Sequence, residues 1–254
     1  MDDPQLEPQR HRDALAGLAR LNAWSVSDRA LFKPIAALAT QLGRPLRLLD
    51  VACGGGDQIV RLARRARRQG FELRPSGLDV SPLALEVAAD KARRSGVEAR
   101  FLQADIKRDG VPEGFDAIVC TLFAHHLEEA DLVGLFRAID AARPRLAVVQ
   151  DLRRTRGGVL LAWAASQVLT RSPIVHNDAL LSVGAAFTRD EVRGLAVRAG
   201  LMNPQPTRVW PLRWQLAWRP RVDSRRTRSG RLTHRPVQLG HARRVGEELG
   251  TRGE

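Results

Sequence analysis

Cysteine is scarce in this chain of 254 residues: there are two, and they lack the spacing of a metal site or a disulfide framework. We expect both, Cys53 and Cys120, to be small buried residues, in agreement with a reducing compartment. No metal site is predicted.

Long apolar runs are missing as well. No stretch approaches the roughly 20 consecutive apolar residues that cross a bilayer, and the first residues, Met-Asp-Asp-Pro, do not resemble a signal sequence. We therefore expect a cytoplasmic protein without a transmembrane segment. The length suffices for one large α/β domain with a full core.

Lysine is nearly absent, although the formal net charge is +13. The positive charge comes almost wholly from arginine, which favours an arginine-rich codon usage over a selected binding face. Residues 219–254 contain ten arginines against four acidic residues and few large apolar ones, so a disordered tail is expected there. Although phosphate contacts dominate nucleic-acid binding, we do not predict a nucleic-acid partner.

The most informative stretch of the chain is 46–57, which has the pattern of a strand, a glycine turn and the start of a helix. Leu48, Leu49 and Val51 predict a buried strand, which the three consecutive glycines that follow cannot continue. Asp57 stands where the N-cap of the next helix is expected. The turn would place backbone N–H groups at a helix start, which is a suitable cradle for a ligand.

Acidic residues occur at the ends of three predicted strands. They are Asp50 in the first strand, Asp79 at the end of 72–79 and Asp105 after 98–103. A turn built for a polyphosphate keeps carboxylates away, so these acids, together with Asp57, indicate a cationic ligand. In strand–turn–helix nucleotide sites, an acidic residue at the end of the second strand binds the ribose diol. A nucleoside that carries an amino-acid sulfonium fits this set.

These residues resemble the class I S-adenosylmethionine-dependent methyltransferases. The family's pattern acid-x-small-x-Gly-x-Gly is matched by Asp50, Ala52, Gly54 and Gly56, with Asp79 as the ribose acid and Asp105 on the adenine side. The resemblance covers about residues 44–218 and implies S-adenosylmethionine as cofactor. The cofactor contacts that it implies are Asp50, Ala52, Cys53, Gly54, Gly56, Asp79, Val80, Asp105, Ile106 and Thr121.

Helices alternate with strands from residue 57 onward, which predicts a parallel sheet with helices on both faces. The family resemblance implies a Rossmann-like three-layer α/β sandwich with a mostly parallel seven-stranded sheet and an antiparallel last strand. The expected helices are 58–69, 81–96, 128–142 and 189–199, the expected strands are 72–79, 98–103, 115–121 and 145–150, and the closing hairpin is 205–211 with 213–218. The expected units are a helical lid at 1–42, a methyltransferase domain at 43–218 with a helical insertion at 157–186, and the tail at 219–254.

Two adjacent histidines follow the fourth strand. The stretch Phe123-Ala-His125-His126 resembles a small-molecule branch of the family that carries Phe-x-His-His. A neutral imidazole is a suitable base for an acceptor proton, so His126 or His125 is a catalytic candidate; the alternative is a histidine that caps the next helix. Asp151 could orient a histidine or pair with Arg153 or Arg154.

The predicted acceptor site is drawn from the less regular segments. The resemblance implies that helices within 10–42 fold over the cofactor and bring Arg20, Asn22 and Trp24 near the ligands; the alternative is that they pack at the sheet edge. It also implies that the apolar helix in 157–186 roofs an acceptor pocket, and the arginine flanks of this helix permit peripheral membrane contact. The substrate candidates are Asn22, Trp24, Arg153, Trp163 and His176.

We therefore predict a methyltransferase (EC 2.1.1) that acts on a small, largely apolar acceptor, at a hydroxyl oxygen. Three alternatives remain: an RNA or protein methyltransferase that uses the basic tail, a C-methyltransferase of a quinone or isoprenoid-like lipid, and a non-catalytic cofactor-binding module. The amino-methylating motif Asn-Pro-Pro-aromatic is missing. No oligomeric state is predicted.

Overall fold

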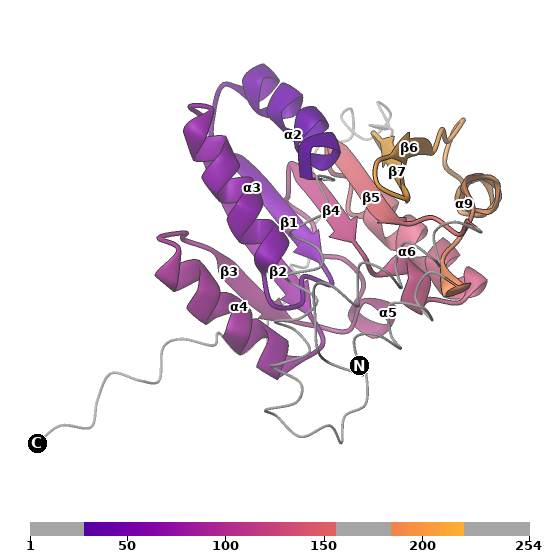
Figure 1. Ribbon diagram of the computed structural model, residues 1–254, viewed down its shortest axis with the longest axis horizontal. Helices are drawn as coiled ribbons and strands as arrows, with labels where there is room; N and C mark the ends of the chain where they lie inside the picture. Colours follow the sequence, from indigo (N-terminus) through magenta and orange to yellow (C-terminus); the bar gives the residue numbers. More distant parts are fainter. Residues whose placement is uncertain (1–27, 156–183, 221–254) are drawn as a thin grey trace, which may run out of the picture.

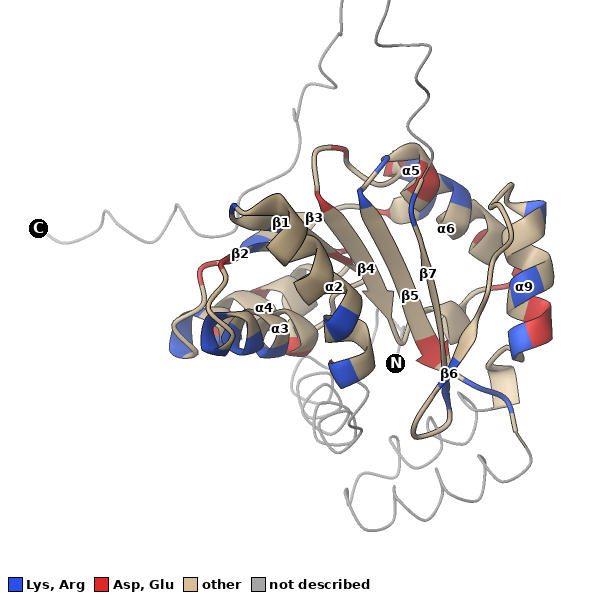
Figure 2. Cartoon of the chain, turned by 90° about the horizontal axis from the view of Figure 1, so that it is seen from above, with Lys and Arg blue, Asp and Glu red and all other residues tan. Residues whose placement is uncertain are grey.

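The computed structural model describes residues 28–155 and 184–220. They form a seven-stranded sheet in the order β3-β2-β1-β4-β5-β7-β6, with helices on both faces (Figures 1 and 2). This is the three-layer α/β sandwich that the sequence predicts. The strands are β1 (Leu46–Val51), β2 (Leu73–Asp79), β3 (Arg100–Gln103), β4 (Ala117–Thr121), β5 (Leu146–Leu152), β6 (Thr207–Val209) and β7 (Arg213–Trp218).

The first five strands are parallel, and the last strand reverses direction. β7 runs antiparallel to both β5 and β6, which confirms the expected closing hairpin. Two residues of β5, Asp151 and Leu152, lie beyond the strand end that the sequence predicts. They continue the strand because they pair with Trp214 and Arg213 of β7.

One face of the sheet is covered by α2 (Asp28–Leu42), α3 (Asp57–Arg68) and α4 (Pro82–Arg94). The apolar stripe of α2, with Leu31, Ile35 and Leu38, is buried against side chains of β1, β4 and β5. The described part of 10–42 thus packs on the sheet. Arg20, Asn22 and Trp24 lie outside the described residues.

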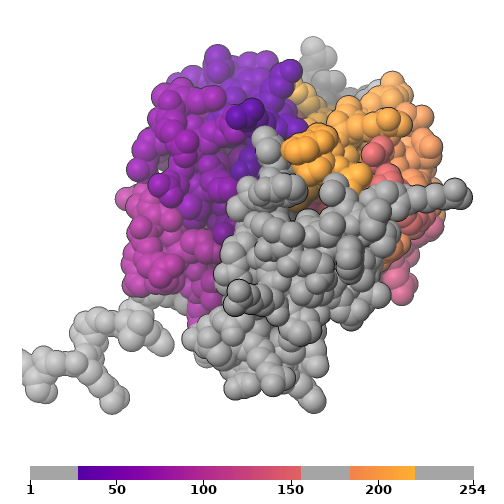
Figure 3. All heavy atoms as spheres, in the orientation of Figure 1, coloured from indigo at the N-terminus to yellow at the C-terminus, as the bar shows by residue number. Residues whose placement is uncertain are grey.

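The opposite face is covered by α5 (Ile106–Asp109), α6 (Glu129–Ala141) and α9 (Arg189–Arg198). Phe136 of α6 and Trp214 of β7 are fully buried there, in a core that α9 completes. Thr188 and Glu191 form a capping box at the start of α9, since each side chain accepts a backbone N–H of the other residue. In the space-filling view, α2 to α4 form one side of the visible surface, and β6, β7 and α9 form the other (Figure 3).

Between the strands expected at 98–103 and 115–121, where the sequence predicts no helix, the structure has the short helix α5. Its N-cap is Asp105, whose carboxylate accepts the backbone N–H of Lys107 at 2.9 Å. A helix of four residues is too short to show an apolar period in the sequence. None of the helices in 28–155 and 184–220 has the length and apolar character to span a bilayer.

Candidate active site

The glycine turn between β1 and α3 is shaped by positive φ angles. Ala52, Gly54 and Gly56 have φ of 55°, 50° and 73°. A Cβ on Gly56 would lie 2.8 Å from Cβ of Ala88 on α4, so the main chain can pass this close to α4 only because Gly56 has no side chain. The turn therefore brings backbone, rather than side chains, to the carboxyl end of β1.

Asp57 differs from its predicted role. Gly56 is the N-cap of α3, and Asp57 is the first helical residue. Its carboxylate accepts a hydrogen bond from Nζ of Lys91 at 2.6 Å, so a lysine of α4 already neutralises it. The carboxylates on which a cationic ligand can draw are therefore those at the strand ends.

Asp50 has the features expected of a carboxyl group that faces a cationic ligand. It is 1% exposed, and neither carboxylate oxygen has a hydrogen-bond partner. Its pKa is raised to about 8, chiefly because burial disfavours the charged form and also because Asp79 is near, with Arg61 opposing the shift. Buried polar oxygens normally have partners, so this carboxyl group fits the positive charge of a bound S-adenosylmethionine.

Asp79 ties the ends of β1 and β2 together. Its Oδ2 accepts the backbone N–H of Gly54 at 2.8 Å, and its Oδ1 accepts that of Ser81 at 3.0 Å. Two carboxylate oxygens have about four acceptor positions, so Asp79 retains capacity for ribose hydroxyls. Asp105 lies just after β3, the strand that pairs with β2. This is the side of the site where the adenine base is expected.

The other predicted cofactor contacts lie along the same edge. Val80, next to Asp79, is an exposed apolar side chain at 63%, whereas Ile106 is partly buried at the start of α5. Thr121 ends β4 and is partly buried. Burial raises the pKa of the Cys53 thiol well above its ordinary value, which agrees with an unreactive structural residue.

His125 and Asp151 form a close pair at the ends of β4 and β5. Nδ1 of His125 lies 2.7 Å from Oδ1 of Asp151, and the backbone N–H of His125 donates to Oδ2 at 3.2 Å. Their side chains are 8% and 1% exposed. Burial disfavours the Asp151 carboxylate, yet its pKa is lowered because His125 and the N–H groups of Leu152 and His125 stabilise the anion.

The two histidines differ in their exposure to solvent. His126 ends the short helix η1 (Ala124–His126) and is exposed, with its ring centroid 4.1 Å from that of His125. Of the partners considered for Asp151, the histidine is the one in contact. Arg154 pairs instead with Glu191 of α9.

Sequence reasoning missed the polar side chains buried behind this pair. Arg213 is 6% exposed, and its pKa is lowered to about 10 by burial, with Asp151 and Asp28 opposing and Arg61 adding to the shift. Nε2 of Gln150 donates to Oε1 of Gln215 at 2.9 Å. No sequence signal marks these residues, because β7 meets β5 only through tertiary pairing.

Four predicted substrate residues, Asn22, Trp24, Trp163 and His176, lie outside the described residues, as does most of 157–186. Arg153 is described and follows β5 directly. Across 28–155 and 184–220, no three His, Cys, Asp or Glu side chains are grouped so that they could hold a metal ion.

Comparisons with known proteins agree with this geometry. Residues 48–143 match the model of a family described as "Methyltransferase domain". The chain is 35% identical over 108 residues to a demethylmenaquinone methyltransferase of Thermus thermophilus and 26% identical over 117 residues to a ubiquinone biosynthesis O-methyltransferase of Rickettsia felis. These matches cover 42% and 46% of this chain, and 47% and 45% of the relatives, so the chain spans less than half of either.

Solved structures share the fold at low identity. An O-methyltransferase family 2 protein from Planctomyces limnophilus, in complex with apigenin, superposes with a TM-score of 0.61 at 19% identity, covering 85% of this chain and 62% of the other. A SAM-dependent methyltransferase from Aquifex aeolicus gives a TM-score of 0.56 at 13% identity, covering 84% and 98%.

Proposed function

Through residues 48–143 this chain belongs to the S-adenosylmethionine-dependent methyltransferases, and on that premise we propose that the protein methylates a hydroxyl oxygen of a small, largely apolar acceptor. The His125–Asp151 pair carries the proposal, since it places an oriented imidazole at the end of β4, beside the strands that bear the cofactor residues. The domain is proposed to extend over 43–218.

The cofactor, when bound, supplies a methyl group activated on a sulfonium. In the proposed arrangement Asp79 accepts hydrogen bonds from the ribose, Asp105 lies on the side of the adenine, and Val80 and Ile106 cover the base. Asp50 contributes negative charge beneath the methionine part, where the turn at Gly54 and Gly56 lets the main chain approach. The remaining proposed contacts are Ala52, Cys53 and Thr121.

Proton removal falls to His125 in this proposal. Asp151 accepts the hydrogen bond of Nδ1–H, which selects the tautomer whose basic lone pair is on Nε2 and stabilises the imidazolium that forms. The imidazole would then accept the acceptor's hydroxyl proton while the oxygen attacks the methyl group in line. His126, which is more exposed, remains the second candidate base.

Methyl transfer to a panel of phenolic acceptors, followed with labelled S-adenosylmethionine, tests the proposal. His125→Gln should lower kcat by about 10²- to 10⁴-fold, which is the usual contribution of a positioned base, and leave the dissociation constant of S-adenosylmethionine within about twofold. Asp151→Asn should also lower kcat, because it no longer selects the Nδ1–H tautomer. His126→Gln tests the second candidate base in the same assay. Full activity of His125→Gln would remove His125 from the reaction.

C-methylation of a quinone-like lipid is the second candidate, favoured by the similarity to the Thermus relative, a demethylmenaquinone methyltransferase. The position of the labelled methyl in the product distinguishes the two, since ether methyl groups and ring methyl groups have different chemical shifts. Peripheral membrane contact would accompany such an acceptor.

A further inference from the structure

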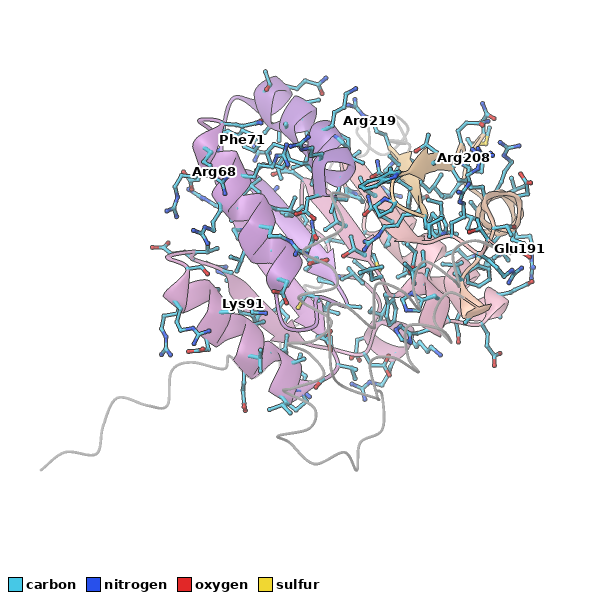
Figure 4. All side chains as sticks on the ribbon, in the orientation of Figure 1. Arg68, Phe71, Lys91, Glu191, Arg208 and Arg219 are labelled. Atoms are coloured by element: carbon cyan, nitrogen blue, oxygen red, sulfur yellow. The ribbon has the colours of Figure 1, made fainter. Side chains whose placement is uncertain are left out.

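Three arginines lie near the carboxyl end of β5 and the β6–β7 hairpin. Arg153 follows β5, and its backbone N–H donates to the carbonyl of Leu212 in the β6–β7 turn at 2.8 Å. Nη1 of Arg189, the first residue of α9, lies 3.5 Å from the carbonyl of Pro206. Arg208, labelled in Figure 4, lies on β6 opposite Trp214 of β7, and Trp214 in turn lies opposite Asp151 of β5. The three side chains come from separate elements that converge here.

Two acidic residues near this cluster are engaged elsewhere. Glu191 pairs with Arg154 and accepts the N–H of Thr188, and Asp151 is paired with His125. In the part of the chain that the structure describes, no carboxylate lies within ion-pair distance of Arg153, Arg189 or Arg208. The cluster therefore has a positive charge that the described fold does not balance.

The charged form of Arg153 is destabilised in this arrangement. Its Nε is buried and has no hydrogen-bond partner. Its pKa is lowered, first by burial and then by the positive charges of Arg208 and Arg189. A partly buried guanidinium that faces two like charges is unfavourable unless an anion joins it, whereas planar N–H donors of several arginines suit an oxyanion well.

We propose that Arg153, Arg189 and Arg208 bind an anionic group, a carboxylate or a phosphate, of the methyl acceptor. This assignment rests on the proposed function and narrows its substrate class to largely apolar hydroxy compounds that carry an acidic group. Arg153 lies two residues after Asp151, just beyond the end of β5, so their Cα atoms are at most about 7 Å apart. An acceptor of one aromatic ring could thus place its hydroxyl group near His125 and its acidic group near Arg153.

Fluorine NMR of two probe anions, 4-fluorobenzoate and 4-fluorophenyl phosphate, tests the site on the full chain without any methyl transfer. We expect at least one anion to bind saturably, and 4-fluorobenzyl alcohol, which lacks the charge, to bind at least tenfold more weakly. Preference for one anion identifies the acidic group as carboxylate or phosphate.

Variants tie the binding to the cluster. Arg153→Gln and the exposed Arg208→Gln should each weaken anion binding tenfold or more, whereas Arg153→Lys should retain much of it. Arg193→Gln is the matched control, because Arg193 is an exposed arginine of α9, the helix of Arg189, and its guanidinium donates to Oε1 of Gln205. Arg208→Gln keeps the test valid if Arg153→Gln does not fold.

Several results would overturn the site: no saturable binding, equal binding of the alcohol, or anion affinity unchanged in Arg153→Gln and Arg208→Gln. Binding to phosphatidylglycerol vesicles without binding to either small anion would also overturn it, in favour of a lipid surface. A protein that binds the anions but not S-adenosylmethionine would contradict the proposed function and leave the anion site in place. Failure of the anions alone leaves the proposed function standing.

Discussion

Asp50 links the electrostatics of the site to the charge of its ligand. Its buried, unpartnered carboxyl group has a pKa of about 8, so it is largely protonated at neutral pH before a cation binds. A sulfonium stabilises the ionised form, and binding then releases a proton. The same proton release is not expected for the demethylated product, whose sulfur is neutral.

The preference of the site for the charged cofactor should depend on pH. Between pH 7 and pH 9, the preference for S-adenosylmethionine over S-adenosylhomocysteine should rise by about tenfold, because Asp50 ionises without the ligand over this range. Calorimetric titrations of both compounds measure the ratio, which cancels the ionisation of their shared amino group. Asp50→Asn should make the ratio independent of pH, and a flat ratio in the unsubstituted protein would remove Asp50 from the sulfonium site.

At the scale of elements, the β1–α3 turn depends on the close approach of α4. Gly56→Ala would place Cβ 2.8 Å from Cβ of Ala88 in a residue with φ of 73°. We expect it to lower the free energy of unfolding by about 2–5 kcal/mol, the sum of left-handed strain and overpacking. Urea unfolding measures the loss.

Gly55→Ala is the matched control for this turn. Its Cβ would meet Cγ1 of Val87 at 3.4 Å and Nζ of Lys91 at 3.5 Å, and its φ is not in the left-handed region. It should change stability by less than about 1 kcal/mol, as substitutions without strain do. Equal losses in the two variants would show that the turn is not held by contact with α4.

At the amino ends of the strands, Asp116 connects two segments of the chain. It directly precedes β4 and binds Arg44, which lies before β1, and Arg47 in β1. It is 2% exposed and accepts two hydrogen bonds from the Arg44 guanidinium, at 2.7 and 2.8 Å, and one from the N–H of Arg47. The Arg44 guanidinium holds the pKa of Asp116 well below its ordinary value, although burial opposes this, and Arg47 adds to the effect.

A lowered pKa means that Asp116 stabilises the fold above the unfolded-state pKa of about 3.9 and that this stabilisation is lost as the pH falls towards the folded-state value. Asp116→Asn should cost about 1–3 kcal/mol at pH 7 and flatten the decline of stability between pH 5 and pH 2. Denaturant unfolding across this range measures both. Glu72→Gln, which affects an exposed pair with Arg74, should change neither; a parallel decline in Asp116→Asn and the unsubstituted chain would contradict the assignment.

At the scale of the whole molecule, the charge of +13 is unevenly distributed: ten arginines against four acids in 219–254 contribute a surplus of six. The described strands form one sheet with the helices packed on it, and all proposed site residues precede residue 219. Catalysis on a small acceptor should therefore not require the last residues.

Deletion of 220–254 tests this prediction. Turnover on a small acceptor should stay within about twofold, since no site residue is removed, and salt-sensitive RNA binding should not be lost with it. Steady-state kinetics and RNA titrations at two salt concentrations measure the two effects. Loss of turnover together with loss of RNA binding would favour a macromolecular acceptor bound through the tail.

Local patterns in the sequence determined the sheet, its alternating helices and the order of the strand-end acids, because burial on both faces requires apolar strands and a main-chain turn requires glycine. The same patterns predicted the helices at 81–96 and 189–199, whose starts are fixed by near neighbours in the chain, the Ser81 N-cap and the Thr188 capping box. Asp57 was placed one residue off, because a glycine with φ of 73° took the N-cap.

Only the tertiary structure decided which residues meet. His125 pairs with Asp151 because β4 and β5 lie side by side, Asp57 is neutralised by Lys91 of another helix, and Arg153 gathers with Arg189 and Arg208 through the β6–β7 hairpin. The spacing of these residues along the chain carries no sign of such contacts, since strand pairing and helix packing bring together side chains that are 26 to 55 positions apart.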